Sequence, residues 1–513
     1  MRRLEFWIAL ISTVALSGCG TTAIDMAPAR PDRPWQPAVG ADGAIAFGKP
    51  QAANAASASS YVLPPNPALA TVTPAPSSID PERTYTLAEL IDIAQSNHPE
   101  TRIAWDDARR AALAEGIAQS TYLPQVTASV IGGLRSAHGN QSGGGVSADG
   151  STSSSGAIAA LSLEWLLFDF GQREAIVESA QQMSIASNIA FTAAHQRVIH
   201  EVCLAFYAND AARARVAITV KSLKNAEDVE AAADDRYRHG VGTVIDAAQA
   251  RQATAQARLA NVRARGRAQD AMLALVTAMG VSPLTRFNVV DVSGRKLSTA
   301  SLQPVERIVS DAISRRPDVL GAYAAERASA AAVRAAEADF KPKIFMSVGG
   351  AYGAGRLDVT AVPPVGQQSG TFNLSGEHWG STVLLGVTVP LYDAGLRKSM
   401  LGQARAAADA ATAASERVRD EAVRQIVMAQ NALETSLEAN EASEALESAA
   451  RTNFNAAFDS YQHGVGTMTA VTLAATQLLQ AEDAAIEAHS GALSAAATLA
   501  FATGALGSAP IWR

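Results

Sequence analysis

The sequence predicts a mixed α/β fold that is mainly helical and is built from one unit that occurs twice. Two runs of 68 residues, 172–239 and 396–463, contain no proline and a single glycine, Gly402. At about 1.5 Å of rise per residue each run forms a helix of roughly 100 Å, whereas globular helices average about 11–12 residues. Both runs end on His-Gly-Val-Gly-Thr, and the two copies lie 224 residues apart. We therefore expect an internal twofold repeat of long helices.

The N-terminus has the pattern of a bacterial lipoprotein signal peptide. Arg2 and Arg3 precede an apolar stretch, residues 6–16, that is too short to cross a bilayer as a helix. The stretch ends in Leu-Ser-Gly-Cys, which resembles a lipobox. We interpret residues 1–18 as the signal peptide and Cys19 as the site of lipid attachment. The alternative is an ordinary signal peptide that contains a cysteine.

The remaining sequence divides into a tether and two repeats. Residues 19–83 contain eleven prolines, all between Pro28 and Pro81. Such a composition cannot bury a core, so we expect an extended tether. The other predicted parts are a first repeat at 84–283, a linker at 284–304, a second repeat at 305–504 and a C-terminal tail at 505–513.

Each repeat is predicted to begin with a short helix and a helix of about 24 residues. A proline separates the two helices at Pro99 and at Pro317, in the position where proline starts a helix. The second helix stops at another proline, Pro124 or Pro342.

Alternating segments follow these helices. Their apolar residues recur at every second position, which is typical of β-strands with two different faces. We expect strands at residues 124–134, 157–168, 342–353 and 380–391, joined by loops at 135–156 and 353–380. Runs of about ten residues match the about 9–11 residues of a transmembrane β-strand. The alternative is a pair of soluble hairpins.

Each long helix is expected to turn back at its His-Gly-Val-Gly-Thr copy. The returning helices are predicted at residues 244–279 and 468–503. Glycine permits the positive φ that such a reversal needs. The two shorter helices of a repeat together approach the length of the long one, so each long helix is expected to pack against two short helices placed end to end.

Four strands are too few to close a barrel. Open strand edges are not tolerated in lipid, because each unpaired backbone group is costly there. We therefore expect a homotrimer with a 12-stranded transmembrane β-barrel, four strands per chain, continuous with a long α-helical barrel. A lipid-tethered coiled-coil scaffold is the alternative, but it would lack the alternating segments.

These features in this order resemble the TolC family of outer-membrane efflux proteins, in particular its lipid-anchored, OprM-like branch. The resemblance covers about residues 84–504. It is carried by Asn97-His98-Pro99-Glu100, Arg316-Pro317-Asp318, Leu123-Pro124-Gln125, Leu391-Tyr392-Asp393-Ala394-Gly395 and the Tyr-x-x-Gly-x-x-Thr patterns at Tyr237 and Tyr461.

The resemblance implies a passive exit duct in the outer membrane, with its helical barrel in the periplasm. Its implied partners are a periplasmic adaptor (membrane fusion) protein and an inner-membrane transporter of the RND or ABC type. Small molecules or drugs are the expected cargo, and the outer-membrane component of a type I protein secretion system is the alternative.

The resemblance also implies roles for the ends of the long helices. It implies that the glycine turns contact the adaptor through Gly240, Val241, Gly242, Thr243, Gly464, Val465, Gly466 and Thr467. It further implies a periplasmic gate in which Asp246 hydrogen-bonds Tyr461. The simpler alternatives are plain turns and, for the carboxylate, a helix cap. The sequence departs from the family where Gly466 replaces an arginine and where Ala470 and Leu473 replace an acidic ring.

No catalytic, metal or cofactor site is indicated. The net charge of −7 and the lack of basic clusters argue against a nucleic-acid partner. His195 and His200 are five residues apart and do not share a helix face. Together with Cys203 they are expected to pack in the core rather than bind a metal. Glycines 143–145 lack the Lys-Ser/Thr of a phosphate-binding loop.

Overall fold

The computed structural model of the chain describes residues 38–39, 45–46, 79–143, 146–295, 297, 304–355, 359–361, 372–374 and 379–506. The chain divides into two compact units, Met1–Pro76 and Ser77–Arg513. In the first unit the structure describes β1 (Ala38–Val39), which pairs antiparallel with β2 (Ile45–Ala46). The predicted signal peptide, Cys19 and almost all of the predicted tether lie outside the described residues.

The second unit is mainly helical, which confirms the predicted predominance of helix. Its described helices are α3 (Leu87–Asn97), α4 (Pro99–Ser120), α5 (Gln172–Arg238), α6 (Val244–Ala278), α7 (Val305–Ala312), α8 (Pro317–Ala338), α9 (Leu396–Gln462) and α10 (Met468–Ala502). Helices α4 and α8 each span 22 residues, α5 and α9 each span 67, and α6 and α10 each span 35. The helices of the second half thus follow the order of those in the first, and three of the four pairs have equal lengths; α3 has 11 residues and α7 has 8.

Both long helices begin at an Asp-x-Gly turn with a left-handed backbone. Gly171 has a φ of 93° and Gly395 a φ of 89°, and the residue before each glycine has a φ of 55°. The Asp169 carboxylate accepts the backbone N–H of Arg173 at 2.9 Å and its Nε–H at 2.8 Å. The aspartate therefore satisfies an N–H group that the first helical turn leaves without a backbone partner.

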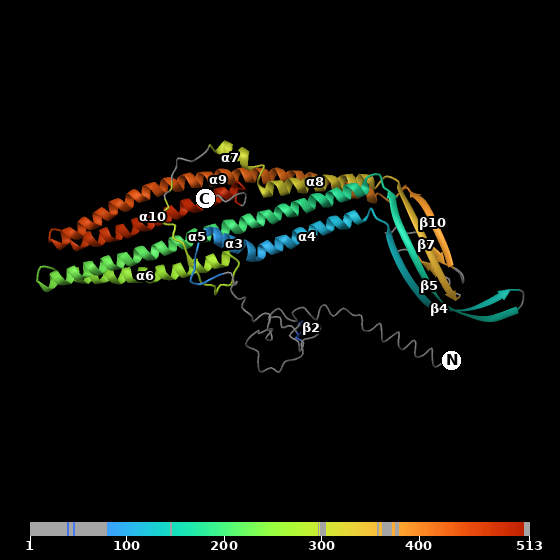
Figure 1. The fold of residues 1–513 in the computed structure, drawn as a ribbon, viewed down its shortest axis with the longest axis horizontal. Helices are drawn as coiled ribbons and strands as arrows, with labels where there is room; N and C mark the ends of the chain where they lie inside the picture. The colour runs from blue at the N-terminus through green and yellow to red at the C-terminus, as the bar shows by residue number, and fades with distance from the viewer. Residues whose placement is uncertain are drawn as a thin grey trace. The chain divides into compact units, whose positions relative to one another are not determined.

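Each long helix packs against two shorter ones placed end to end, as the helix lengths predict. Helix α5 contacts α4 and α6, and α9 contacts α8 and α10 (Figure 1). The end of α6 meets the start of α4 at Gly280, where a Cβ would lie only 2.7 Å from the Cα of His98. Helices α8 and α10 also contact α5, and these contacts join the two halves.

The buried core is thin and is divided into clusters along the helices. The largest cluster lies where α3 packs on α5, and it contains Leu90, Val202, Phe206, Leu275 and Leu493. A parallel pair of two-residue strands, β3 (Thr84–Tyr85) and β6 (Asn288–Val289), covers this region. Alanine is frequent among the buried residues of α8 and α10, and its small side chain lets the helix axes approach closely.

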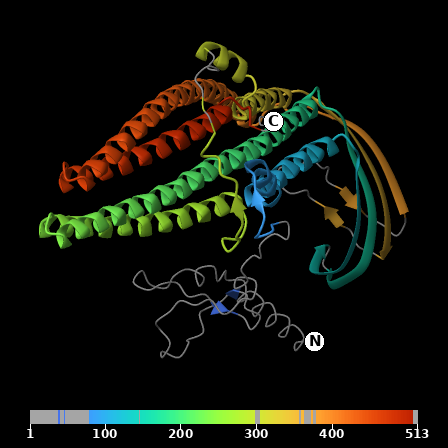
Figure 2. The same cartoon turned by 60° about the vertical axis from the view of Figure 1, so that its left-hand side comes forward.

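Four antiparallel strands form one sheet in the order β10–β7–β5–β4. They are β4 (Gln125–Gly143), β5 (Val146–Phe168), β7 (Lys343–Gly355) and β10 (Trp379–Thr388). The strands continue from the helix ends that lie opposite the His-Gly-Val-Gly-Thr turns, and Figure 1 and Figure 2 show this from two directions. β4 and β10 are the edges of the sheet, each paired on one side within the chain.

The first hairpin is longer than predicted. Residues 135–143 and 146–155, which are predicted as a loop, continue the strand ladder as far as the pair Gly143 and Val146. Strand pairing uses backbone groups, so the hairpin can extend through a Gly/Ser-rich segment that has no apolar alternation. The absence of that alternation is the reason that the sequence pattern missed the extension.

The second hairpin differs from the prediction in smaller ways. The loop predicted at residues 353–380 contains a short antiparallel pair, β8 (Val359–Ala361) and β9 (Phe372–Leu374). β10 ends at Thr388, before the predicted strand end at residue 391. Val389, which continues the alternation, precedes Pro390, and proline cannot donate a ladder hydrogen bond.

Candidate functional site

Two helical turns lie at the ends of the long helices that are remote from the sheet. We call residues 236–246 tip 1; they comprise the end of α5, the turn and the start of α6. Residues 460–470, which comprise the end of α9, the turn and the start of α10, are tip 2. Gly240 has a φ of 78° and Gly464 a φ of 81°. A Cβ on Gly466 would lie 2.9 Å from the backbone nitrogen of Tyr461. These glycines are therefore required by the turn itself, which is one of the two roles that the sequence suggests.

The predicted adaptor-contacting residues lie at the surface of both tips. The Val241 side chain is 64% exposed and that of Val465 84%. Gly240, Gly464, Thr243 and Thr467 are also exposed, whereas Gly242 and Gly466 are half-buried. An apolar side chain is thus presented at the outermost point of each turn, next to bare glycine backbone.

Asp246 caps its own helix. Its backbone N–H donates to Thr243 Oγ1 at 3.1 Å, and its Oδ2 accepts the backbone N–H of Thr243 at 3.1 Å. This reciprocal pair is a capping box. Tip 2 has half of this arrangement, because the residue corresponding to Asp246 is Ala470, whose N–H donates to Thr467 Oγ1.

Tyr461 is buried at tip 2 and is only 2% exposed. Its phenol oxygen has no hydrogen-bond partner within the described part of the chain. Burial raises the pKa of Tyr461, and the negative charge of Asp246 raises it further. The structure therefore brings the two predicted gate residues into one electrostatic environment but does not join them by a hydrogen bond. The Thr243 N–H and hydroxyl occupy Oδ2 of the aspartate instead.

A mixed apolar cluster holds the two tips together. Helices α5 and α6 contribute Val229, Ala233 and Ala250. Helices α9 and α10, with Tyr461 among them, contribute Phe454, Met468, Val471, Ala474 and Leu478. Within this cluster the aromatic, Met and Leu side chains come from α9, tip 2 and α10, whereas α5 and α6 contribute valine and alanine.

Arg236 is a tip residue that the sequence analysis did not single out. Its Nη1 donates to the carbonyl oxygen of Tyr461 at 3.2 Å, and its Nη2 donates to the carbonyl oxygen of Val241 at 3.3 Å. Its guanidinium carbon lies 5.2 Å from the centroid of the Tyr461 ring. The repeat contains a signal that could have found it, because the residue 224 positions further on is Ser460.

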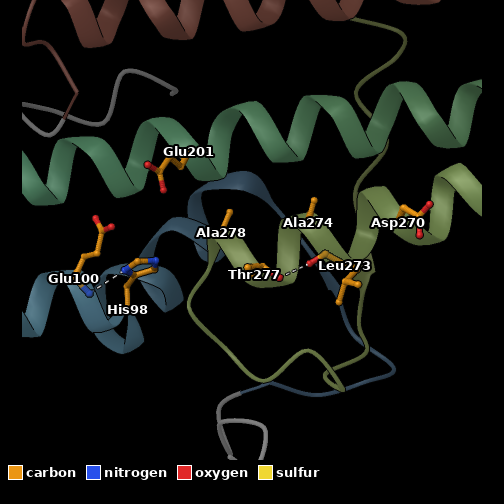
Figure 3. Close-up of a pocket in the computed structure, with 8 residues that line it drawn as sticks. All are labelled: His98, Glu100, Glu201, Asp270, Leu273, Ala274, Thr277 and Ala278. Carbon is orange, nitrogen blue, oxygen red and sulfur yellow. Dashed lines mark hydrogen bonds between the residues drawn. The ribbon is translucent and has the colours of Figure 1, made fainter. Parts of the chain in front are cut away.

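A separate cavity of about 610 Å³ lies between α4, α5 and α6. Figure 3 shows that Glu100, Glu201 and Asp270 border it together with His98. His98 is engaged locally, since its Nδ1 accepts the backbone N–H of Glu100 at 3.1 Å. Among the described residues no group of three His, Cys, Asp or Glu side chains has the arrangement of a metal site.

His195, His200 and Cys203 all take part in packing. The His200 ring stacks on Phe501, and its Nε2 lies 3.1 Å from Thr498 Oγ1. His195 makes an edge-to-face contact with a phenylalanine ring. Cys203 is 3% exposed, and burial raises the pKa of its thiol to about 11.

The sheet has one apolar and one polar face. Its register places Val126, Leu163, Val348 and Val383 in one row across the four strands. The adjacent row contains Thr127, Ser162, Gly349 and Thr382. Successive residues of a strand point to opposite faces, so the two rows lie on opposite sides. In the described part of the chain no helix combines the length and the apolar character that crossing a bilayer requires.

Known proteins share both the sequence pattern and this architecture. A family model described as outer membrane efflux protein matches residues 90–281 and 308–505. The outer membrane protein OprJ of Pseudomonas aeruginosa is 28% identical over 379 residues, which cover 74% of this chain and 75% of OprJ.

Two solved structures superimpose on most of the chain. The crystal structure of a membrane protein from Pseudomonas aeruginosa has a TM-score of 0.68 and 26% identity, and the match covers 82% of this chain and 93% of that one. The open state of the MtrE outer membrane channel of Neisseria gonorrhoeae has a TM-score of 0.66 and 23% identity over 82% of this chain and 88% of that one. Because the family model matches well over half of the residues and extends over both halves, the chain belongs to the outer membrane efflux protein family.

Proposed function

We propose that this chain is the exit duct of a tripartite efflux system in the outer membrane. The observation that carries the proposal is the family match over both halves of a chain in which one four-stranded sheet continues into two 67-residue helices. The duct conducts small molecules passively from an inner-membrane pump and a periplasmic adaptor to the exterior. The outer-membrane localisation follows from family membership.

The sheet supports a barrel that three chains complete. Within the described part of the chain, its edge strands β4 and β10 each pair with one neighbouring strand only. Open edges are not stable in lipid, so twelve strands from three chains form the closed wall. The apolar face meets lipid and the polar face lines the lumen.

Aromatic residues on the apolar face fit the two boundaries of a bilayer. Trp379 pairs with Tyr352 across β10 and β7, and their side chains are 76% and 61% exposed. Trp165 pairs with Met346 on the same face, six residues along β7 from Tyr352. Six residues span about 20 Å along a strand, which is close to the height of the apolar band of a membrane barrel.

The tips form the periplasmic entrance in this proposal. The exposed valines and glycines of tips 1 and 2 contact the adaptor, and Asp246 with Tyr461 narrows the entrance. Support comes from the buried Tyr461 phenol, which has no hydrogen-bond partner among the described residues, and from the Asp246 carboxylate, whose charge raises the pKa of that phenol. Lipid attachment at Cys19 is part of the same proposal and rests on the lipobox pattern alone.

Planar-bilayer recording of the purified protein tests the channel. Reproducible conductance steps are expected, and their absence from a correctly folded preparation would remove the proposed function.

The gate residues are tested by two substitutions in the same recording. Tyr461→Phe removes the phenol oxygen and Asp246→Asn removes the charge, and each is expected to raise conductance severalfold because it removes one partner of the proposed closing pair. His463→Ala at the exposed surface of tip 2 is the control. Conductance equal to that of the unmodified protein in both gate variants would assign Asp246 to helix capping only.

A further inference from the structure

The side chain of Arg236 contacts both tips of one chain. It projects from the last turn of α5, donates to Val241 of its own tip and donates to Tyr461 of the other. Its guanidinium also faces the Tyr461 ring at cation–π distance. One cation therefore makes three favourable contacts, two of which cross from tip 1 to tip 2.

The ends of the long helices explain why a cation belongs here. The last turn of a helix exposes carbonyl groups with partial negative charge, and cations are favoured beside them. The last turn of α5 contains Arg236 and Arg238, whereas the last turn of α9 contains no basic residue. Because Ser460 occupies the corresponding position, α9 depends on α5 for this cation.

The two turns differ at the glycine that Arg236 approaches. A Cβ on Gly464 would lie 3.2 Å from Arg236 Nη1, whereas a Cβ on Gly240 would have no neighbour within 4 Å. The backbone of tip 2 therefore leaves space for the guanidinium, and tip 1 has no equivalent occupant. The contact is specific to one half of the repeat.

We infer that Arg236 is a positioning residue that holds tip 2 against tip 1 and so keeps the entrance of the duct narrow. We call its contacts with Tyr461 and Val241 the clip. This inference rests on the proposed function of the tips as that entrance. Moving α9 and α10 away from α5 breaks the bond to the Tyr461 carbonyl and the ring contact together. The bond to Val241 survives, so the arginine stays on tip 1 and can restore the contact when the tips close again.

Conductance of charge-removing and charge-retaining variants tests the clip. Arg236→Gln is expected to raise single-channel conductance severalfold, whereas Arg236→Lys is expected to give an intermediate value because it keeps the charge but not the two-pronged geometry. Arg238→Gln is the matched control, because Arg238 lies in the same turn and is exposed, and its described partner is Asp235 on its own helix. Conductance of Arg236→Gln equal to that of the control would overturn the inference.

Cross-linking measures the same contact without recording a current. Val241→Cys and Val465→Cys place thiols on the two exposed valines, and a short bismaleimide joins them within one chain when the tips are together. When Arg236→Gln is introduced into this double-cysteine variant, the yield of the intra-chain cross-linked product is expected to fall severalfold. An unchanged yield would also overturn the inference.

The outcomes separate this inference from the proposed function. If the unmodified protein does not conduct, the proposed function fails, while the cross-linking result still decides whether Arg236 holds the tips. Tyr461→Phe keeps the ring and the carbonyl that Arg236 contacts and removes only the phenol oxygen, whose pKa the Arg236 charge lowers. The Arg236 contact itself is therefore judged from the Arg236 variants.

Discussion

At the residue scale, a buried ion pair connects the sheet to the long helix α5. The side chains of Arg173 and Asp169 are 8% and 7% exposed. The same guanidinium donates to the carbonyl oxygens of Thr121 at 3.1 Å, Leu166 at 2.6 Å and Leu167 at 3.2 Å. A single side chain thus holds the end of α4, the end of β5 and the start of α5 in fixed relation.

Replacing that arginine is expected to be costly. Arg173→Ala leaves the Asp169 carboxylate buried without its cation, which typically costs about 3–5 kcal/mol of stability. Chemical unfolding followed by the helical circular dichroism signal measures the change. Arg397→Ala is the control in the other half, where the arginine side chain is 20% exposed and the loss is expected to be smaller. Equal losses at the two sites would contradict the role of burial.

Arg236 shows why some site residues escape sequence reasoning. The glycine turns were predictable because His-Gly-Val-Gly-Thr occurs twice and glycine permits the positive φ that a helix reversal needs. An arginine in a helix with many charged residues does not indicate any particular contact from its position in the sequence. Its partner, the Tyr461 carbonyl, lies 225 residues away in sequence, and only the tertiary packing of the helices brings the two together.

At the element scale, helix breakers and the period of the apolar residues decided which elements could be predicted. The two 67-residue helices were evident because their sequences contain almost no helix-breaking residues, and both begin directly after a glycine turn. Alternation indicated part of each of the four strands. It failed for residues 135–143 and 146–155, where backbone pairing persists although the sequence has no period of two.

The two faces of the sheet are expected to respond differently to charge. Val383→Lys places a cation on the apolar face, at a cost of about 2–4 kcal/mol near the bilayer midplane. Thr382→Lys, the adjacent residue on the polar face, is the matched control and is expected to assemble normally. The amount of heat-modifiable oligomer in isolated outer membranes measures the difference. Equal yields from both variants would argue against the assignment of the faces.

At the scale of the whole molecule, much of the apolar surface of a single chain remains uncovered. Helix α4 leaves Ile103, Leu113 and Ile117 more than 60% exposed, and the sheet leaves Val130 80% exposed. Monomeric soluble proteins rarely expose contiguous apolar areas of this kind. Lipid and further copies of the chain are the proposed covers for these surfaces.

Three chains are therefore expected in the assembled protein. Light scattering coupled to size-exclusion chromatography in detergent measures the protein mass, which is expected to be about three times that of one chain because twelve strands close the wall. Native mass spectrometry after lipid removal is the independent check. A stable monomer that retains its sheet in circular dichroism would refute the trimeric barrel.

The sequence by itself determined the elements of this protein, because helix breakers, glycine turns and alternation act over a few residues at a time. It indicated the two long helices, the turns that end them and the strand segments between them. Only the tertiary structure decided which surfaces meet: the contacts of α8 and α10 with α5, the extended first hairpin, the burial of Tyr461 and the contact of Arg236 with both tips. These contacts join residues far apart in the chain, and local patterns carry no information about the relative rotation of two packed helices.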